Sequence, residues 1–168
     1  QLILHKGTCC GIDTEGKFNP KNIDSQKLAH MKAKWGITDS DWVIGYSGRL
    51  VRDKGIIELV RAFRNLKKEH ANYKLLLVGM FEVRDALPDD VQQDIKNDSQ
   101  IVWTDFQNSD MEYFYSMMNV YVLASYREGF PTGVLEAQAM QVPVITTRAT
   151  GCCDSIQEGV TGLFVEHD

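Results

Sequence analysis

Two glutamates at a fixed spacing frame the stretch of the chain that is best suited to chemistry. Residues 128–136 read E-G-F-P-T-G-V-L-E, so Glu128 and Glu136 enclose seven residues. Carboxylates accept hydrogen bonds from hydroxyls, in which sugars and riboses are rich. Pro131 suits the first position of a helix, and the free N–H groups of that helix start would attract an anion such as phosphate. Together these groups describe a site for a nucleotide sugar. The alternative is that one glutamate complements the helix dipole and the other is solvated.

A second stretch, residues 48–55, reads G-R-L-V-R-D-K-G and would bring two cations to the same edge of the sheet. Gly48 permits close backbone approach. Arg49 can grip a phosphate with its planar fork, and Lys54 supplies a point charge. The stretch is not a P-loop, because the spacing G-x-x-x-x-G-K-[ST] is absent. Taken alone, a basic loop is usually just solvated, but beside residues 128–136 it would meet a diphosphate.

The elements that must position these stretches alternate between apolar runs and helical periods. Strands are predicted at 42–47, 73–79, 101–103, 120–125 and 142–147. Helices are predicted at 27–35, from 56 to at least 66, at 88–97, from 109 or 110 to 118, and from 131 onward. This alternation predicts an α/β fold: a Rossmann-like, doubly wound, mostly parallel sheet of about six strands with helices on both faces. Ligands of such sheets bind at the carboxyl ends of the strands.

Composition narrows the class of protein. The chain has 168 residues, 43% hydrophobic and 24% charged, which suits one globular domain. Its net charge of −5 argues against a nucleic-acid partner. No apolar run is long enough for a membrane span, and no signal peptide opens the chain. The cysteines form two adjacent pairs, Cys9-Cys10 and Cys152-Cys153, which we interpret as reduced thiols of a cytoplasmic protein. We interpret Asp39-Ser40-Asp41 as a surface turn and expect no metal site.

The E-x7-E spacing of Glu128 and Glu136 resembles the signature of family 4 of the retaining glycosyltransferases with the GT-B fold. Residues 48–55 resemble the G-R-L-x-x-x-K-G loop of that family, and Gly159 and Gly162 match its final glycine-rich stretch. The resemblance covers nearly the whole chain. It implies the donor-binding domain of an enzyme that moves a sugar from a nucleotide diphosphate sugar to an acceptor hydroxyl and retains the anomeric configuration. Residues 1–24 would be the interdomain crossover and residues 25–168 the nucleotide-sugar-binding domain. The N-terminal acceptor domain and the last C-terminal helices would lie outside the chain.

The resemblance also implies roles for individual residues. Arg49 and Lys54 would offset the charge of the leaving diphosphate without a metal or cofactor. Glu128 would bind hydroxyls of the donor sugar, and Glu136 those of the ribose. The catalytic set is thus Arg49, Lys54 and Glu128. The remaining donor contacts would be Gly48, Gly79, Trp103, Thr104, Gly129, Phe130, Pro131, Thr132, Gly133 and Val134, with the N–H groups of 132–134 on the distal phosphate. For Trp103, a place in the core is an equal alternative.

The resemblance implies partners at the level of the family only. The donor would be UDP-, GDP- or ADP-linked, and the acceptor a glycan or lipid-linked saccharide bound through the missing domain. The pathway would be capsular polysaccharide, lipopolysaccharide or other surface-glycan biosynthesis, with the parent protein cytoplasmic or peripheral at the inner face of the membrane. The chain alone is expected to be inactive. The alternatives are a non-catalytic nucleotide-sugar-binding module and a GT-B-like epimerase or phosphorylase.

Overall fold

The computed structural model describes residues 11–166. Residues 1–10 of the predicted crossover segment, with the pair Cys9-Cys10, lie outside the described residues. Cys152 is buried and Cys153 is exposed, and both are free thiols.

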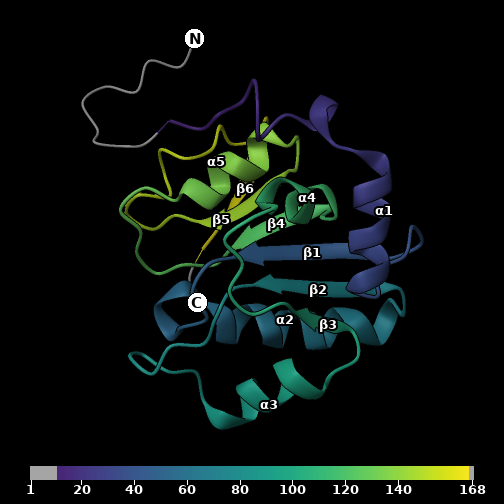
Figure 1. The fold of residues 1–168 in the computed structure, drawn as a ribbon. Coiled ribbons are helices and arrows are strands. Elements are labelled where there is room, and N and C mark those ends of the chain that lie inside the picture. The colour runs from purple at the N-terminus through teal and green to yellow at the C-terminus, as the bar shows by residue number, and fades with distance from the viewer. Residues whose placement is uncertain (1–10, 167–168) are drawn as a thin grey trace.

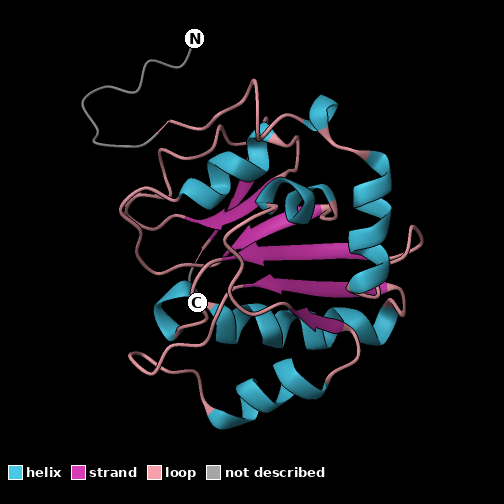
Figure 2. Ribbon diagram, viewed as in Figure 1, coloured by secondary structure: helices cyan, strands magenta, loops and turns pink. Residues whose placement is uncertain are grey.

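Within residues 11–166, six strands form one sheet in the order β3-β2-β1-β4-β5-β6 (Figure 2). Their bounds are β1 Trp42–Ser47, β2 Tyr73–Val78, β3 Ile101–Trp103, β4 Val120–Leu123, β5 Val144–Thr147 and β6 Gly162–Val165. Every pairing between these strands is parallel. The predicted α/β fold with a doubly wound sheet is therefore confirmed, and the described sheet is parallel throughout.

Residues 11–166 also form five α-helices and two short 3-10 helices, of which η1 and α1 precede β1. Their bounds are η1 Pro20–Asn22, α1 Ser25–Lys34, η2 Arg52–Lys54, α2 Ile56–Glu69, α3 Asp89–Asn97, α4 Met111–Ser116 and α5 Thr132–Ala139. Helices α2 and α3 cover one face of the sheet, whereas α1, α4 and α5 lie on the other (Figure 1). The central strands are thus covered on both sides, and the side chains of Leu75, Leu76 and Leu77 in β2 are fully buried.

One predicted helix start needs a correction, and another has an unexpected contact. Pro131 is not the first helical residue but the N-cap of α5, because its ψ of 95° is extended rather than helical. Asp110 stands at the N-cap of α4 with a φ of 59° and makes no side-chain capping bond. Its carboxylate instead accepts a hydrogen bond from Lys27 Nζ at 2.5 Å. A tertiary contact has therefore replaced the local cap.

The order of the strands fixes where a ligand can enter. Strands β1 and β4 are neighbours, yet the chain leaves β1 toward β2 and leaves β4 toward β5. The loops that follow the two strands therefore diverge and open a crevice at the carboxyl edge, the usual ligand site of open α/β sheets.

Gly55, between η2 and α2, brings the two sides of this crevice together. Its φ is +67°, and a Cβ atom added to it would lie 2.0 Å from the carbonyl oxygen of Ala124, just after β4. Only glycine satisfies both the left-handed backbone and this close approach.

We predict that Gly55→Ala destabilises the fold much more than Gly36→Ala. Gly36 has a similar φ of +63°, but a Cβ atom added to it would meet no atom within 4 Å, so alanine adds only backbone strain of about 1–2 kcal/mol there. At Gly55 the overlap with Ala124 adds further cost, for a total of about 3 kcal/mol or more. Urea denaturation measures both changes in the free energy of unfolding. Equal losses would show that the close approach carries no cost.

Candidate functional site

A groove at the carboxyl edge consists of two adjoining chambers. The larger chamber has a volume of about 460 Å³ and the smaller one about 280 Å³. They share the residues Ser47, Gly48, Arg49, Thr132 and Gly133. The structure thus joins the end of β1 and the start of α5, as the sequence predicted for the two chemistry-bearing stretches.

The smaller chamber holds a close pair of opposite charges. Lys54 Nζ lies 2.9 Å from Glu128 Oε1, and the two side chains are only 13% and 15% exposed. The same ammonium donates a hydrogen bond to the carbonyl oxygen of Arg127 at 3.1 Å. An ammonium has three N–H groups, so these contacts leave Lys54 one donor for a ligand.

Arg49 lines both chambers and is held by an acid that the sequence did not single out. Its Nη1 donates to Glu82 Oε2 at 3.0 Å, and this hydrogen bond raises the pKa of Arg49. Glu82 lies in the loop after β2 and lines the larger chamber. No motif marks that loop, so only the fold could reveal this contact.

The start of α5 presents fewer free donors than predicted. The N–H of Val134 donates to the carbonyl oxygen of Pro131 at 3.1 Å, and the side chain of Val134 is fully buried. Among the described residues, the N–H groups of Thr132 and Gly133 have no helical partner, because the first turn of a helix leaves such donors free. These two residues line both chambers.

Glu136 belongs to a hydrogen-bond network beneath the larger chamber. Tyr115 donates its hydroxyl to Glu136 Oε2 at 2.7 Å. Because that phenol has only one proton, the 2.7 Å contact with Ser47 must be donated by the Ser47 hydroxyl. Burial raises the pKa of Glu136, and the bond from Tyr115 partly offsets that rise. The sequence did not single out Tyr115, because the periodicity of its helix does not indicate that its hydroxyl reaches Glu136.

The other predicted donor contacts divide into two groups. Gly79 lines the larger chamber, and Phe130 and Pro131 line the smaller one. Within residues 11–166, the lining of the two chambers does not include Trp103, Thr104, Gly129 or Val134.

Trp103 does not line the larger chamber but holds a residue that does, Gly79. Its Nε1 donates to the carbonyl oxygen of Gly79 at 2.7 Å, and its ring packs against Phe81. The sequence did not single out the exposed apolar side chains of Met80 and Phe106, which line the larger chamber. They follow strands whose ends come together only in the folded sheet.

The residues predicted to form a surface turn lie in one. Asp39 pairs with Lys32 at 2.8 Å, and Asp41 accepts a hydrogen bond from the N–H of Thr38. They precede β1, at the edge of the sheet opposite the groove. Across the described part of the chain, no three His, Cys, Asp or Glu side chains gather in a way that could hold a metal ion. None of its helices combines the length and apolar composition of a membrane span.

Comparison with known proteins identifies a family. The family model for "Glycosyl transferases group 1" matches residues 29–168. The chain is 38% identical over 164 residues to the capsular polysaccharide biosynthesis glycosyltransferase CapM of Staphylococcus aureus. That alignment covers 98% of this chain and 41% of CapM, so the chain spans well under half the length of this relative.

Solved structures agree with the sequence comparison. The C-terminal domain of the group 1 glycosyl transferase LpcC from Francisella tularensis has a TM-score of 0.75 and 27% identity, covering 93% of this chain and 80% of that one. HepE of Anabaena, in complex with UDP-glucose, has a TM-score of 0.74 at 20% identity and shares the fold. Its alignment covers 89% of this chain and 41% of HepE.

We predict that Glu136→Gln stabilises the fold at pH 7. Glu136 has a raised pKa in the folded state, whereas the ordinary pKa of a glutamate is 4.5. The free energy of unfolding therefore falls as the pH rises above 4.5, because the folded state then binds more protons than the unfolded state. A neutral amide still accepts the bond from Tyr115 and removes that cost. The gain is about 0.5–1 kcal/mol, because solvent screens a partly exposed charge.

Urea denaturation at several pH values measures this gain, which should vanish below pH 4.5. Glu15→Gln is the matched control, because Glu15 is exposed in the loop before η1 and does not line either chamber. A Glu136→Gln protein that is less stable than the wild type at every pH would contradict the role of burial.

Proposed function

Because this chain belongs to the group 1 glycosyltransferases, we propose that its groove binds a nucleotide diphosphate sugar for transfer to an acceptor hydroxyl. One observation carries the proposal: Arg49, Lys54 and the start of α5 line a single small chamber. Two cations and two free N–H groups there match the charge of a diphosphate. The UDP-glucose bound to HepE, which shares the fold, makes a UDP-sugar the first donor to test.

In this proposal the protein acts mainly through electrostatics. When the bond between the sugar and the diphosphate breaks, negative charge develops on the leaving oxygen. Arg49 and Lys54 would offset that charge in place of a metal ion, because both are fixed before the reaction starts. Glu128 would accept hydrogen bonds from the donor sugar and is not assigned as a nucleophile, since its carboxylate is already paired with Lys54 at 2.9 Å. The transfer would retain the anomeric configuration.

The larger chamber suits the nucleoside. Glu136 lines it with a carboxylate for the ribose hydroxyls, and Met80 and Phe106 add apolar surface for a base. Trp103 and Thr104 would contribute to the nucleoside end of the groove indirectly. The Nε1 group of Trp103 holds the backbone carbonyl of Gly79, which lines the larger chamber.

The activity of a whole parent protein is a further part of the proposal. The chain matches 41% of CapM, and CapM is a glycosyltransferase of capsular polysaccharide biosynthesis. We therefore propose that the parent protein builds a surface glycan, with the acceptor saccharide held between this chain and a domain outside it. It would work in the cytoplasm or at the inner face of the membrane. Sugar transfer by the parent, measured beside epimerisation and simple binding, separates this function from the alternatives.

We predict that Arg49→Ala and Lys54→Ala each weaken UDP binding by roughly tenfold to a hundredfold. A charge-assisted hydrogen bond contributes about 1.5–3 kcal/mol, which corresponds to that range. Lys54→Ala should have the larger effect, because it also leaves Glu128 unpaired beside the diphosphate. Calorimetry at constant ionic strength measures the affinities. Arg61→Ala, which removes an exposed charge on α2, should leave the affinity unchanged. Unchanged affinity in both groove variants would remove these residues from the site.

We also predict that Glu136→Ala weakens binding of UDP about fivefold to tenfold and leaves binding of free pyrophosphate unchanged. Only the nucleotide carries the ribose hydroxyls whose hydrogen bonds Glu136 would accept, and one such bond contributes about 1 kcal/mol or slightly more. Calorimetric titration with each ligand makes the comparison. Equal losses for both ligands would contradict the ribose role and place Glu136 near the phosphates.

A thermal-shift screen of UDP-, GDP- and ADP-sugars identifies the donor. A ligand present at a hundred times its dissociation constant stabilises the folded state by about 2.7 kcal/mol, which gives a measurable rise in melting temperature. We expect one nucleotide class to stabilise the chain more than the others. No shift with any of them would contradict donor binding.

A further inference from the structure

A third pocket adjoins the groove and is lined mainly by arginines and aspartates. This arginine pocket has a volume of about 440 Å³ and is formed by Arg49, Val51, Asp53, Arg84, Asp85 and Arg127. We propose that it binds the anionic group, a phosphate or carboxylate, of a saccharide. Resting on the proposed function, we assign this saccharide as the acceptor of the transferred sugar.

The walls of the pocket are fixed by backbone hydrogen bonds. The N–H of Arg52 donates to the carbonyl oxygen of Asp85 at 3.1 Å, and the N–H of Asp53 donates to Asp85 Oδ2 at 2.8 Å. These bonds tie the loop after β2 to η2. On the other side, the N–H of Tyr126 donates to the carbonyl oxygen of Asp53 at 2.9 Å, which ties the loop after β4 to η2 as well. The segments that carry Arg84 and Arg127 are therefore held against the same short helix.

Two of the guanidinium groups are available. Arg84 and Arg127 are exposed, and among residues 11–166 neither side chain has an ion-pair partner. A guanidinium binds phosphate and carboxylate through two parallel N–H donors, which favours planar or tetrahedral oxyanions. The chain as a whole carries a net charge of −5, so this group of arginines does not reflect a generally basic surface. Local chemistry must account for it.

The aspartates restrict the ligand to more than a bare anion. Three arginines and two aspartates leave the pocket only weakly positive, which disfavours a polyanion. Asp85 is an exposed residue and uses Oδ2 to accept the N–H of Asp53. A carboxylate has further acceptor sites, which can take hydrogen bonds from hydroxyls. A ligand with one oxyanion and several hydroxyls matches this mixture, as in a sugar phosphate or a uronic acid.

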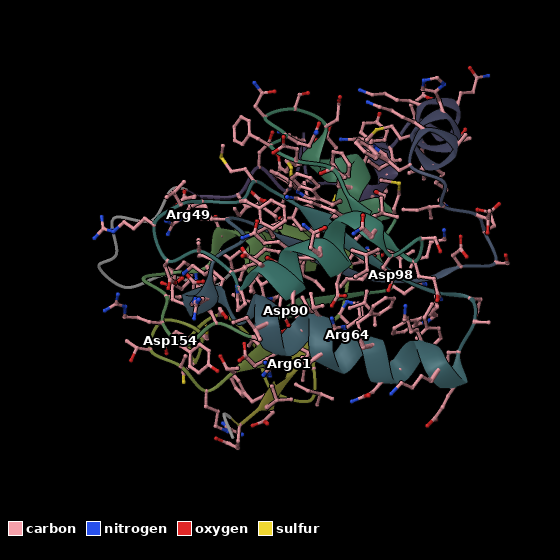
Figure 3. The ribbon with its side chains drawn as sticks, turned by 90° about the horizontal axis from the view of Figure 1, so that it is seen from below. Arg49, Arg61, Arg64, Asp90, Asp98 and Asp154 are labelled. Carbon is pink, nitrogen blue, oxygen red and sulfur yellow. The ribbon has the colours of Figure 1, made fainter. Side chains whose placement is uncertain are left out.

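The position of the pocket supports a link to the transfer reaction. Arg49 lines the arginine pocket and also both chambers of the groove. A saccharide anchored by Arg84 and Arg127 would therefore lie next to the smaller chamber, where the donor sugar is proposed to bind. Figure 3 shows Arg49 at one end of the molecule and Arg61 on α2, well away from it. Arg61 is thus a suitable control for the loss of an exposed charge.

The test titrates the chain with three sugars and measures affinity by NMR or calorimetry. Glucose 6-phosphate carries a phosphate, methyl glucuronide carries a carboxylate, and methyl glucoside is the neutral control. We expect at least one anionic sugar to bind tenfold or more tightly than methyl glucoside. Arg84→Gln and Arg127→Gln should each weaken that binding about fivefold or more, whereas Arg61→Gln should not. The tighter of the two anionic sugars identifies the recognised group.

A second titration, with UDP, separates this proposal from donor binding. Arg84→Gln and Arg127→Gln should keep their UDP affinity within about twofold, whereas Lys54→Gln should lose UDP affinity and retain the anionic sugar. Equal binding of neutral and anionic sugars, or equal behaviour of Arg84→Gln, Arg127→Gln and Arg61→Gln, would overturn the arginine pocket. Binding of the anionic sugar without binding of UDP would instead overturn donor binding and the assignment as acceptor, and would leave the anion site in place.

Discussion

The contact between Lys54 and Glu128 holds the two halves of the sheet's carboxyl edge together. Lys54 is the last residue of η2, which follows β1, and Glu128 lies in the loop after β4. Because the chain leaves the two strands in opposite directions, these segments lie on opposite sides of the crevice. Both side chains are mostly buried, so each charge depends on the other: breaking a buried pair costs about 3–5 kcal/mol. The close approach of Gly55 to Ala124 reinforces the same junction. Contacts within the chain thus define the shape of the groove.

A second polar network supports the groove from beneath. The hydroxyls of Ser47, Tyr115 and Tyr121 lie together, and the Tyr115 hydroxyl donates to Glu136 at 2.7 Å. Burial raises the pKa of Tyr121 and Tyr115 far above the ordinary range, so both remain neutral donors. A carboxylate held by a neutral phenol keeps its second oxygen for a ligand. The network therefore costs the fold some stability at Glu136 and orients an acceptor for hydroxyls.

The sequence predicted the features that depend on local pattern. Apolar runs located the strands, and the spacing of Glu128 and Glu136 located the edge at which they lie. It missed features that arise only when distant loops meet: the pairing of Arg49 with Glu82, and the arginine pocket. The sequence also placed the start of α5 at Pro131, one residue before the observed start at Thr132, because proline is compatible with both the N-cap and the first turn. Residue type determines what a group can do, but the topology determines which group lies opposite it.

Each of the two cations in the groove is paired with a carboxylate of the chain. Glu82 holds Arg49 at 3.0 Å, and Glu128 holds Lys54 at 2.9 Å. A diphosphate that enters the groove must compete with carboxylates of the same sign, so its net gain is smaller than two new ion pairs suggest. The two acids differ in this respect, because the side chain of Glu82 is 29% exposed and that of Glu128 only 15%. Glu82 can turn toward solvent at little cost, whereas Glu128 remains in the chamber with Lys54. The geometry therefore favours exchange of Glu82 for phosphate at Arg49, while Lys54 serves the diphosphate and Glu128 together.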